Sequence, residues 1–142
     1  MKTSNSSLKV FINLSKILTE SSRRFNGGLD GIGFNEFVVL FHLNQMSDKK
    51  IRRIDLAEKM GFTASGITRI LAPMEKIGLI QKEAAARDAR VSYVTITPSG
   101  ERNLKETLEK TESFFEEIFP SNRLKNIDDL SKWLIERGGM VK

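Results

Sequence analysis

The stretch that most constrains the fold is 54–100, which reads IDLAEKMGFTASGITRILAPMEKIGLIQKEAAARDARVSYVTITPSG. Apolar residues at helical spacing predict a short helix over 53–60. Gly61 follows it, at the position after a helix where a left-handed backbone costs glycine least. A second apolar helix comes next, with Thr63 as its N-cap and Gly78 as its stop. Two helices joined by so short a glycine turn predict a helix-turn-helix.

Two strand-forming runs, 79–83 and 91–97, come directly after the second helix. The later run is rich in the β-branched and aromatic residues that favour strands. We expect the runs to pair as a β-hairpin, with a wing loop over 82–90. Pro73 removes a backbone hydrogen bond inside the second helix, so we expect a kink there with the helix continuing beyond it. A helix-turn-helix that carries such a wing has a shape that fits duplex DNA.

Helical spacing of apolar residues also predicts helices outside this stretch, over 6–25, 34–45, 98–119 and 127–137. Ile51 is expected to form a one-residue strand bridge. The predicted fold class is therefore mainly α with a small β-hairpin wing (α+β), a winged helix-turn-helix flanked by N- and C-terminal helices.

The net charge of +5 is concentrated in one part of the sequence. Residues 49–93 contain ten Lys or Arg against five Asp or Glu, and the remainder of the chain holds thirteen of each. A local surplus of cations suits a phosphate-facing surface, because affinity for a polyanion comes from counterion release. A solvated basic face gives the same pattern, so charge alone leaves both interpretations open.

Composition argues against several other functions. The chain has no cysteine, which rules out disulfides, thiolate metal sites and cysteine-based redox sensing. Its single histidine, His42, lies in the apolar helix over 34–45, which favours a packed core residue over a metal ligand. Without a glycine-rich phosphate loop or metal-spaced ligands, we expect neither an enzyme nor a bound metal or cofactor. No apolar run reaches the roughly 20 residues that cross a bilayer, and the N-terminus lacks a signal-peptide pattern, so we expect a cytoplasmic protein without a membrane partner.

The second helix of the motif presents small polar residues at its start. Small hydroxyl side chains at a helix N-terminus can bond phosphates, aided by the helix dipole, and they let a helix enter the major groove. An arginine in the same helix could read guanine. The alternative is an ordinary capped helix with a solvated polar face. The residues that we expect to contact DNA here are Thr63, Ala64, Ser65, Gly66, Thr68 and Arg69.

The wing loop carries Arg87, Asp88 and Arg90. A narrow minor groove has enhanced negative potential, which attracts inserted arginine. An aspartate two residues away can hold an arginine fork in place through paired hydrogen bonds. A surface ion pair worth ~0–1 kcal/mol is the alternative interpretation. Because the pattern follows a helix-turn-helix, it favours DNA contact by all three residues.

The span from about 34 to 100 resembles the MarR family of bacterial winged helix-turn-helix regulators. The residues that carry the resemblance are LAEKMGFTASGITRILAPMEKIGLI at 56–80, DAR at 88–90 and VTITPSG at 94–100. Family-like helices flank the span, so the resemblance extends over nearly the whole chain.

The resemblance implies a homodimer in which the first and last helices interlock, so that two winged domains read a palindrome in double-stranded DNA. The dimerisation helices would lie at 1–32 and 99–142, and the winged DNA-binding domain at 33–98. The second helix of the motif would enter the major groove. Arg90 matches the family's wing arginine, which enters the minor groove, and Asp88 matches the acid that orients it.

One position departs from the family pattern. The family often has Thr or Ser where this chain has Arg52, at the start of the helix over 53–60. Arginine cannot cap a helix, and a cation there opposes the helix dipole. Our hypothesis is that Arg52 and Arg53 approach DNA phosphates. The alternative is a helix boundary that lies one residue away from the expected one.

The terminal helices favour dimerisation independently of the family. A winged domain of roughly 65 residues leaves little surface to cover apolar stripes at 10–18, 104–118 and 124–134, which would be costly in water. Packing them across a two-fold axis hides them and sets two recognition helices about one DNA turn apart, roughly 34 Å. The alternative is that the stripes fold back within a monomer.

Two hypotheses for function follow. The first is a ligand-responsive DNA-binding regulator, a repressor that a small aromatic or lipophilic effector releases. By analogy with the fold, the effector pocket would lie among Phe11, Phe37, Phe41 and the helix over 101–119. The second is a winged-helix module that binds protein and not DNA, which the local charge surplus and the arginine-bearing wing disfavour.

Overall fold

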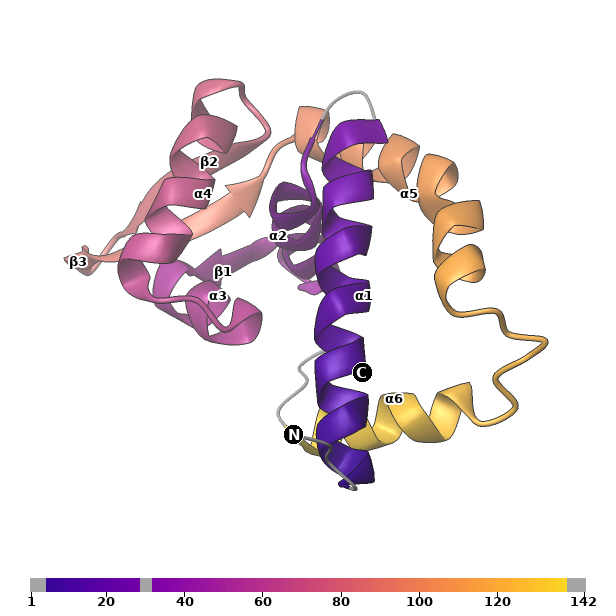
Figure 1. Cartoon of the computed structure of the whole chain (residues 1–142). Helices are drawn as coiled ribbons and strands as arrows, with labels where there is room; N and C mark the ends of the chain where they lie inside the picture. The colour runs from indigo at the N-terminus through magenta and orange to yellow at the C-terminus, as the bar shows by residue number, and fades with distance from the viewer. Residues whose placement is uncertain (1–4, 29–31, 138–142) are drawn as a thin grey trace. The chain divides into compact units, whose positions relative to one another are not determined.

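The computed structural model of the chain describes residues 5–28 and 32–137 (Figure 1). These residues form mainly helices, together with one small β-sheet, which confirms the predicted fold class. Contacts between residues divide the chain into two compact units, Met1–Phe34 and Asn35–Lys142.

The first unit is dominated by helix α1 (Ser6–Gly28), which extends three residues beyond the end that we expected at 25. Asn26 does not stop the helix, because its side-chain Oδ1 accepts a hydrogen bond from the Phe34 backbone N–H at 2.7 Å. The rings of Phe25 and Phe34 meet edge to face, with centroids 5.5 Å apart. The side-chain amide of Asn26 therefore bonds the first residue of the next helix and does not disrupt the backbone hydrogen bonds of α1.

The remaining helices follow the sequence pattern closely. The predicted boundary of the 53–60 helix is confirmed, so the alternative of a misplaced boundary at Arg52 is wrong. The five helices after α1 are α2 (Phe34–Gln45), α3 (Arg53–Met60), α4 (Ala64–Lys76), α5 (Pro98–Ile118) and α6 (Ile127–Glu136).

Two glycines follow the ends of α3 and α4, and one proline lies inside α4. Gly61 adopts φ +71° and Gly78 adopts φ +82°, the left-handed region that glycine enters without the cost of a Cβ. Pro73 lies within α4, and the helix continues to Lys76 beyond it. Pro73 is exposed, and the apolar period runs on past it to the buried Met74.

The strands β1 (Lys50–Arg52), β2 (Ile80–Ala85) and β3 (Asp88–Ile96) form one antiparallel sheet in the order β1-β3-β2. β1 is a three-residue strand, longer than the single-residue bridge that we expected, and it pairs Ile51 with Val94. The β2–β3 hairpin forms the wing, and its tip lies at the edge of the second unit (Figure 1).

The expected wing loop over 82–90 is wrong in extent. Pairing continues to Ala84 opposite Ser92, then to Ala85 opposite Asp88 after a register irregularity. Only two residues, 86 and 87, form the turn. Alanine is a poor strand former, so this part of β2 is ordered by its pairing with β3 and not by its own propensity.

The core of the second unit is apolar and includes the inward faces of α3, α4 and the sheet. Burial of each large aliphatic side chain stabilises the fold by roughly 1.5–3 kcal/mol. The face predicted for α4 is confirmed at Ile67, Leu71 and Met74. The side chains with at most 1% exposure in this unit are Val39, Leu40, Leu43, Leu56, Ile67, Leu71, Met74, Ile80, Val94 and Thr111.

A tight joint fixes the wing to α5. Thr97 caps α5 by accepting from the Gly100 N–H at 3.0 Å, while its hydroxyl also donates to the Gly78 carbonyl at 2.6 Å. The Thr97 N–H donates to the Leu79 carbonyl at 3.1 Å. A Cβ at Gly100 would clash with that same carbonyl oxygen. The joint therefore requires glycine where the sheet ends and α5 begins.

Candidate nucleic-acid interface

The first turn of α4 is built as the sequence predicted. Thr63 has extended backbone angles and its Oγ1 accepts the Gly66 N–H at 3.1 Å, which makes it the N-cap. Its hydroxyl also lies 3.2 Å from the Ser65 hydroxyl. A Cβ at Gly66 would lie 3.2 Å from Thr63 Oγ1, so a larger residue would crowd the cap. The exposed residues of this α4 polar face are Thr63, Ala64, Ser65, Thr68 and Arg69, with Gly66 half-buried among them.

Arg53 links the two helices of the motif. Its Nη1 donates to Thr68 Oγ1 at 2.9 Å and to the Ala64 carbonyl at 3.3 Å. The Thr68 hydroxyl in turn lies 2.9 Å from the Ala64 carbonyl and donates to it. Sequence patterns could not reveal this contact, because it joins residues fifteen positions apart. Arg53 is half-buried and bonded within the fold, and its expected approach to DNA phosphates stays a prediction.

Arg52 occupies the N-cap position of α3 without any side-chain cap bond. Its guanidinium instead holds Asp55 through Nε–Oδ2 at 2.8 Å and Nη2–Oδ1 at 3.1 Å. This hydrogen bonding lowers the pKa of Asp55 from its ordinary value, so the carboxylate is ionised in the first turn of α3. An acid there complements the helix dipole that the cation opposes. The signal was visible in the sequence as an acid three residues after Arg52, and we missed it.

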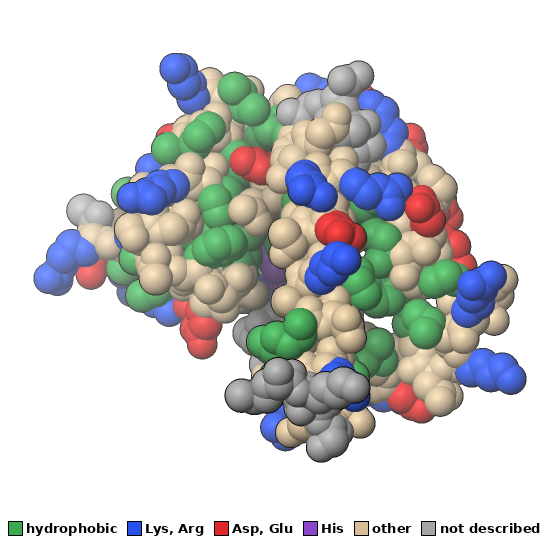
Figure 2. Space-filling model, in the orientation of Figure 1, with side chains coloured by type: hydrophobic (Ala, Val, Ile, Leu, Met, Phe, Trp, Pro, Cys, Tyr) green, Lys and Arg blue, Asp and Glu red, His purple; other side chains and the backbone are tan. Residues whose placement is uncertain are grey.

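The tip of the wing is basic and open to solvent. Arg90 Nε contacts Asp88 Oδ1 at 3.3 Å, and the Arg90 backbone N–H donates to the same oxygen at 2.9 Å. The pairing that we expected is thus one side-chain contact plus one backbone bond, and the Arg90 side chain is still 93% exposed. Arg87 is exposed in the turn. Figure 2 shows Lys and Arg side chains at this outer end of the hairpin.

Arginines from two elements meet beside the sheet. A small hollow of about 170 Å³ lies where the start of α3 faces β3. It is lined by Arg52, Arg53, Ile54, Arg90, Val91 and Ser92. The fold therefore brings the two sequence-predicted arginine groups, at 52–53 and at 90, to a common surface. Arg69 and Arg87 stand apart from this hollow, and neither makes an ion pair within the described part of the chain.

Two of the three phenylalanines predicted for an effector pocket, Phe37 and Phe41, lie in the second unit. Phe37 is buried and stacks on Phe115, with ring centroids 6.1 Å apart, and its ring lies 6.5 Å from that of Phe41. Phe11 belongs to α1 in the other unit, where it is exposed.

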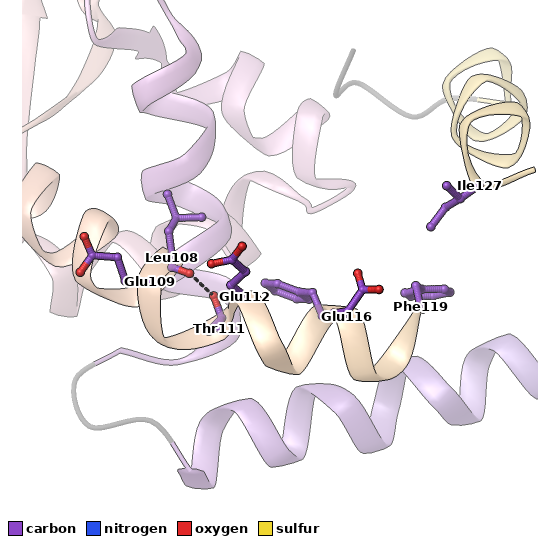
Figure 3. A pocket seen from close by; sticks show the side chains of 8 residues that line it. Leu108, Glu109, Thr111, Glu112, Glu116, Phe119 and Ile127 are labelled. Atoms are coloured by element: carbon purple, nitrogen blue, oxygen red, sulfur yellow. Dashed lines mark hydrogen bonds between the residues drawn. The ribbon is translucent and has the colours of Figure 1, made fainter. Parts of the chain in front are cut away.

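A larger pocket of about 560 Å³ lies along α5 and ends at the first residue of α6 (Figure 3). Its lining is mainly apolar and includes three glutamates. Glu116 accepts hydrogen bonds from the Ser121 hydroxyl and backbone N–H at 2.7 and 2.8 Å, which lowers its pKa from the ordinary value. The lining residues are Leu108, Glu109, Thr111, Glu112, Phe115, Glu116, Phe119 and Ile127. This pocket includes part of the 101–119 helix that we predicted, but a different set of aromatic residues.

Residues 5–28 and 32–137 contain neither a candidate metal cluster nor a candidate membrane-spanning helix. These residues contain no group of three or more His, Asp or Glu side chains that could hold a metal ion. Among the described helices, none combines the length and the apolar character needed to cross a bilayer.

Comparison with known proteins gives a consistent picture. A model of the MarR family matches residues 34–92. The HTH-type transcriptional regulator PapX of Escherichia coli is 27% identical over 93 residues, covering 66% of this chain and 56% of PapX. The chain thus matches only about half the length of that curated relative.

Solved structures resemble the chain over nearly its full length. The transcriptional regulator BldR from Sulfolobus solfataricus superposes with a TM-score of 0.81 at 24% identity, covering 96% of each chain. Sco3205, a MarR family transcriptional regulator from Streptomyces coelicolor solved in complex with DNA, superposes with a TM-score of 0.78 at 19% identity, covering 96% of this chain and 89% of that one. At these identities the likeness establishes the fold.

Proposed function

Because the chain belongs to the MarR family, we propose that it is a DNA-binding transcriptional regulator that acts as a homodimer. The observation that carries the proposal is the placement of exposed cations around a small, polar helix start. The α4 polar face has no bulky side chain before Arg69, and arginines of the α3 start and of the wing line one hollow nearby. A helix start of this kind fits the major groove, while a projecting arginine suits the minor groove.

The charge distribution supports nucleic acid over protein as the partner. The whole positive excess of the chain falls in residues 49–93, which hold α3, α4 and the wing. Cations in this arrangement release counterions when they meet phosphates, so affinity should fall steeply with salt. We assign the α4 polar face to contacts with DNA bases. Arg52, Arg87 and Arg90 are assigned to the DNA phosphate backbone and the minor groove, and Asp88 is assigned to orienting Arg90.

Homodimerisation is supported by the apolar surface of the terminal helices. In α6, the exposed residues Leu130, Trp133 and Leu134 recur at helical spacing, and the helix has no buried residue. In α1, large apolar side chains such as Phe11 and Leu18 are more than half exposed. Such surface is costly in water and is hidden when two copies pack together. We therefore assign 1–32 and 99–142 to dimerisation and 33–98 to DNA binding.

We further propose that the regulator represses transcription from palindromic operators in the cytoplasm, without a catalytic role, and that a small aromatic or lipophilic effector releases it. The mainly apolar lining of the α5 pocket supports an effector of this kind, and Phe37 packs directly against Phe115 of that lining. A ligand there would contact the same long helix that begins at the wing joint, so its binding could alter the spacing of the two recognition helices.

Selection from a randomised duplex library tests this function. The purified chain should retain a palindromic sequence with half-sites about one helical turn apart. The complex should contain two chains per duplex. Retention of no duplex at any salt concentration would instead favour a winged-helix module that binds protein.

A further inference from the structure

We propose that Arg53 fixes the hydrogen-bonding polarity of Thr68, so that α4 presents an acceptor, and not a donor, to one base in each half-site. This assignment rests on the proposed DNA-binding function and names a specificity element within it. It predicts a preference for adenine or cytosine over guanine or thymine at one position on one strand.

The proposal follows from counting the bonding capacity of the Thr68 hydroxyl. A threonine hydroxyl has one proton to donate and two lone pairs that accept. Arg53 can only donate, so its Nη1, at 2.9 Å, must occupy one lone pair. The proton is directed at the Ala64 carbonyl, 2.9 Å away. One lone pair is therefore left, and the exposed side of Thr68 can only accept.

The Ala64 carbonyl reinforces this arrangement. It receives the Thr68 proton and also a second, longer bond from Arg53 Nη1 at 3.3 Å. Turning the hydroxyl proton outward would give up the bond to this carbonyl. In the chain from Arg53 through the Thr68 hydroxyl to the Ala64 carbonyl, each bond strengthens the next, which favours the observed polarity, whereas the longer direct bond from Arg53 competes for the same oxygen.

In the major groove this polarity has a distinct consequence. The exocyclic amino groups of adenine and cytosine are donors, whereas guanine and thymine present only acceptors there. A hydroxyl free to rotate could bond either class, but one that only accepts discriminates between them. Thr68 is exposed on the α4 polar face, one helical turn after the exposed Ala64, so a base edge can reach it. Arg53 thus acts as a positioning residue, and Thr68 makes the contact.

The test uses the full-length chain and the duplex that it selects from a random library. Each half-site position is changed to all four base pairs, and affinity is measured for wild type, Thr68→Val, Arg53→Met and Arg53→Lys. In wild type, one position should favour adenine or cytosine by about 2- to 10-fold, the range expected of one hydrogen bond. Thr68→Val should abolish that preference alone, and Arg53→Met should weaken or reverse it. Arg53→Lys should keep it, because an ammonium also only donates.

Salt dependence separates a positioning residue from a phosphate contact. Arg53→Met should leave the slope of log affinity against log salt unchanged, whereas loss of a phosphate contact would reduce it by about one. Unchanged base preferences in Arg53→Met would overturn the proposal whatever the slope, as would a Thr68→Val chain that keeps every preference. If Arg53→Met fails to fold, Arg53→Lys takes its place: loss of the preference in that chain would overturn the proposal. A wild-type chain that selects no duplex would overturn the proposed function itself, which is a different outcome.

Discussion

The guanidinium of Arg52 holds the carboxylate of Asp55 through two hydrogen bonds, of 2.8 and 3.1 Å, across the first turn of α3. This pair explains how a cation can stand at a helix N-cap, where it opposes the helix dipole. The acid restores the favourable charge at the helix start, and the arginine remains half-exposed beside Arg90 in the same hollow. Arg52 is therefore placed for a role at the surface and not for capping.

Arg52→Thr should separate stability from DNA binding. Threonine is a good N-cap and suits the strand position that pairs with Tyr93, so the free energy of unfolding should stay the same or rise. The salt slope of DNA binding should fall by about one, because a phosphate contact is lost. Lys76→Ala, which removes an exposed cation from the far end of α4, is the matched control and should leave the slope unchanged. An unchanged slope in Arg52→Thr would remove Arg52 from the DNA interface.

Gly100→Ala should weaken the joint between the wing and α5. The new methyl group would clash with the Leu79 carbonyl oxygen and lie 2.8 Å from Ile96 Cγ1. Overpacking of this kind costs about 1–3 kcal/mol, and urea unfolding measures it. Gly27→Ala is the control, because a Cβ there meets no atom within 4 Å and a helical alanine gains about 0.5–1 kcal/mol over glycine. Equal stability of the two variants would show that the joint is looser than the structure indicates.

Residues that act on their near neighbours in the sequence predicted most of this fold. The features that were missed depend on contacts between residues far apart in the sequence. Gly61, Thr63 and Gly78 act within a few residues, so the helix-turn-helix could be predicted with its boundaries. The full length of the hairpin could not, because Ala84 and Ala85 are ordered by residues on β3. The Arg53–Thr68 contact likewise depends on how two helices pack, which periodicity does not encode.

The free energy of unfolding should depend on pH through His42, the chain's single histidine. Burial, and then the charge of Lys59, lower its pKa below the ordinary 6.5, so the folded state favours the neutral ring. The unfolded chain binds a proton as the pH falls through 6.5. The contribution to stability is therefore fully present above that value and is lost below it. Urea unfolding at pH about 7.5 and about 5.5 should show this loss in wild type but not in His42→Leu. The same loss in both chains would contradict the assignment.

Trp133→Glu should weaken the homodimer. Trp133 is 54% exposed in the single chain and shares an apolar face of α6 with Leu130 and Leu134. A carboxylate there would be desolvated in a dimer, so sedimentation velocity should show dissociation at concentrations where wild type is dimeric. Lys132→Glu places a carboxylate on the opposite side of the helix and should leave the dimer intact. In wild type, fluorescence of the single tryptophan should shift to longer wavelength on dilution. A monomeric wild type would rule out the dimer.

The most direct test of the central claim, that α4 and the wing bind duplex DNA, is the affinity of wild type and Arg90→Ala for the selected duplex across a series of salt concentrations. We predict a linear fall of log affinity with log salt in wild type, a slope smaller by about one in Arg90→Ala, and no change in the dimer. Affinity that does not depend on salt, or an Arg90→Ala chain with an unchanged slope and affinity, would contradict the account.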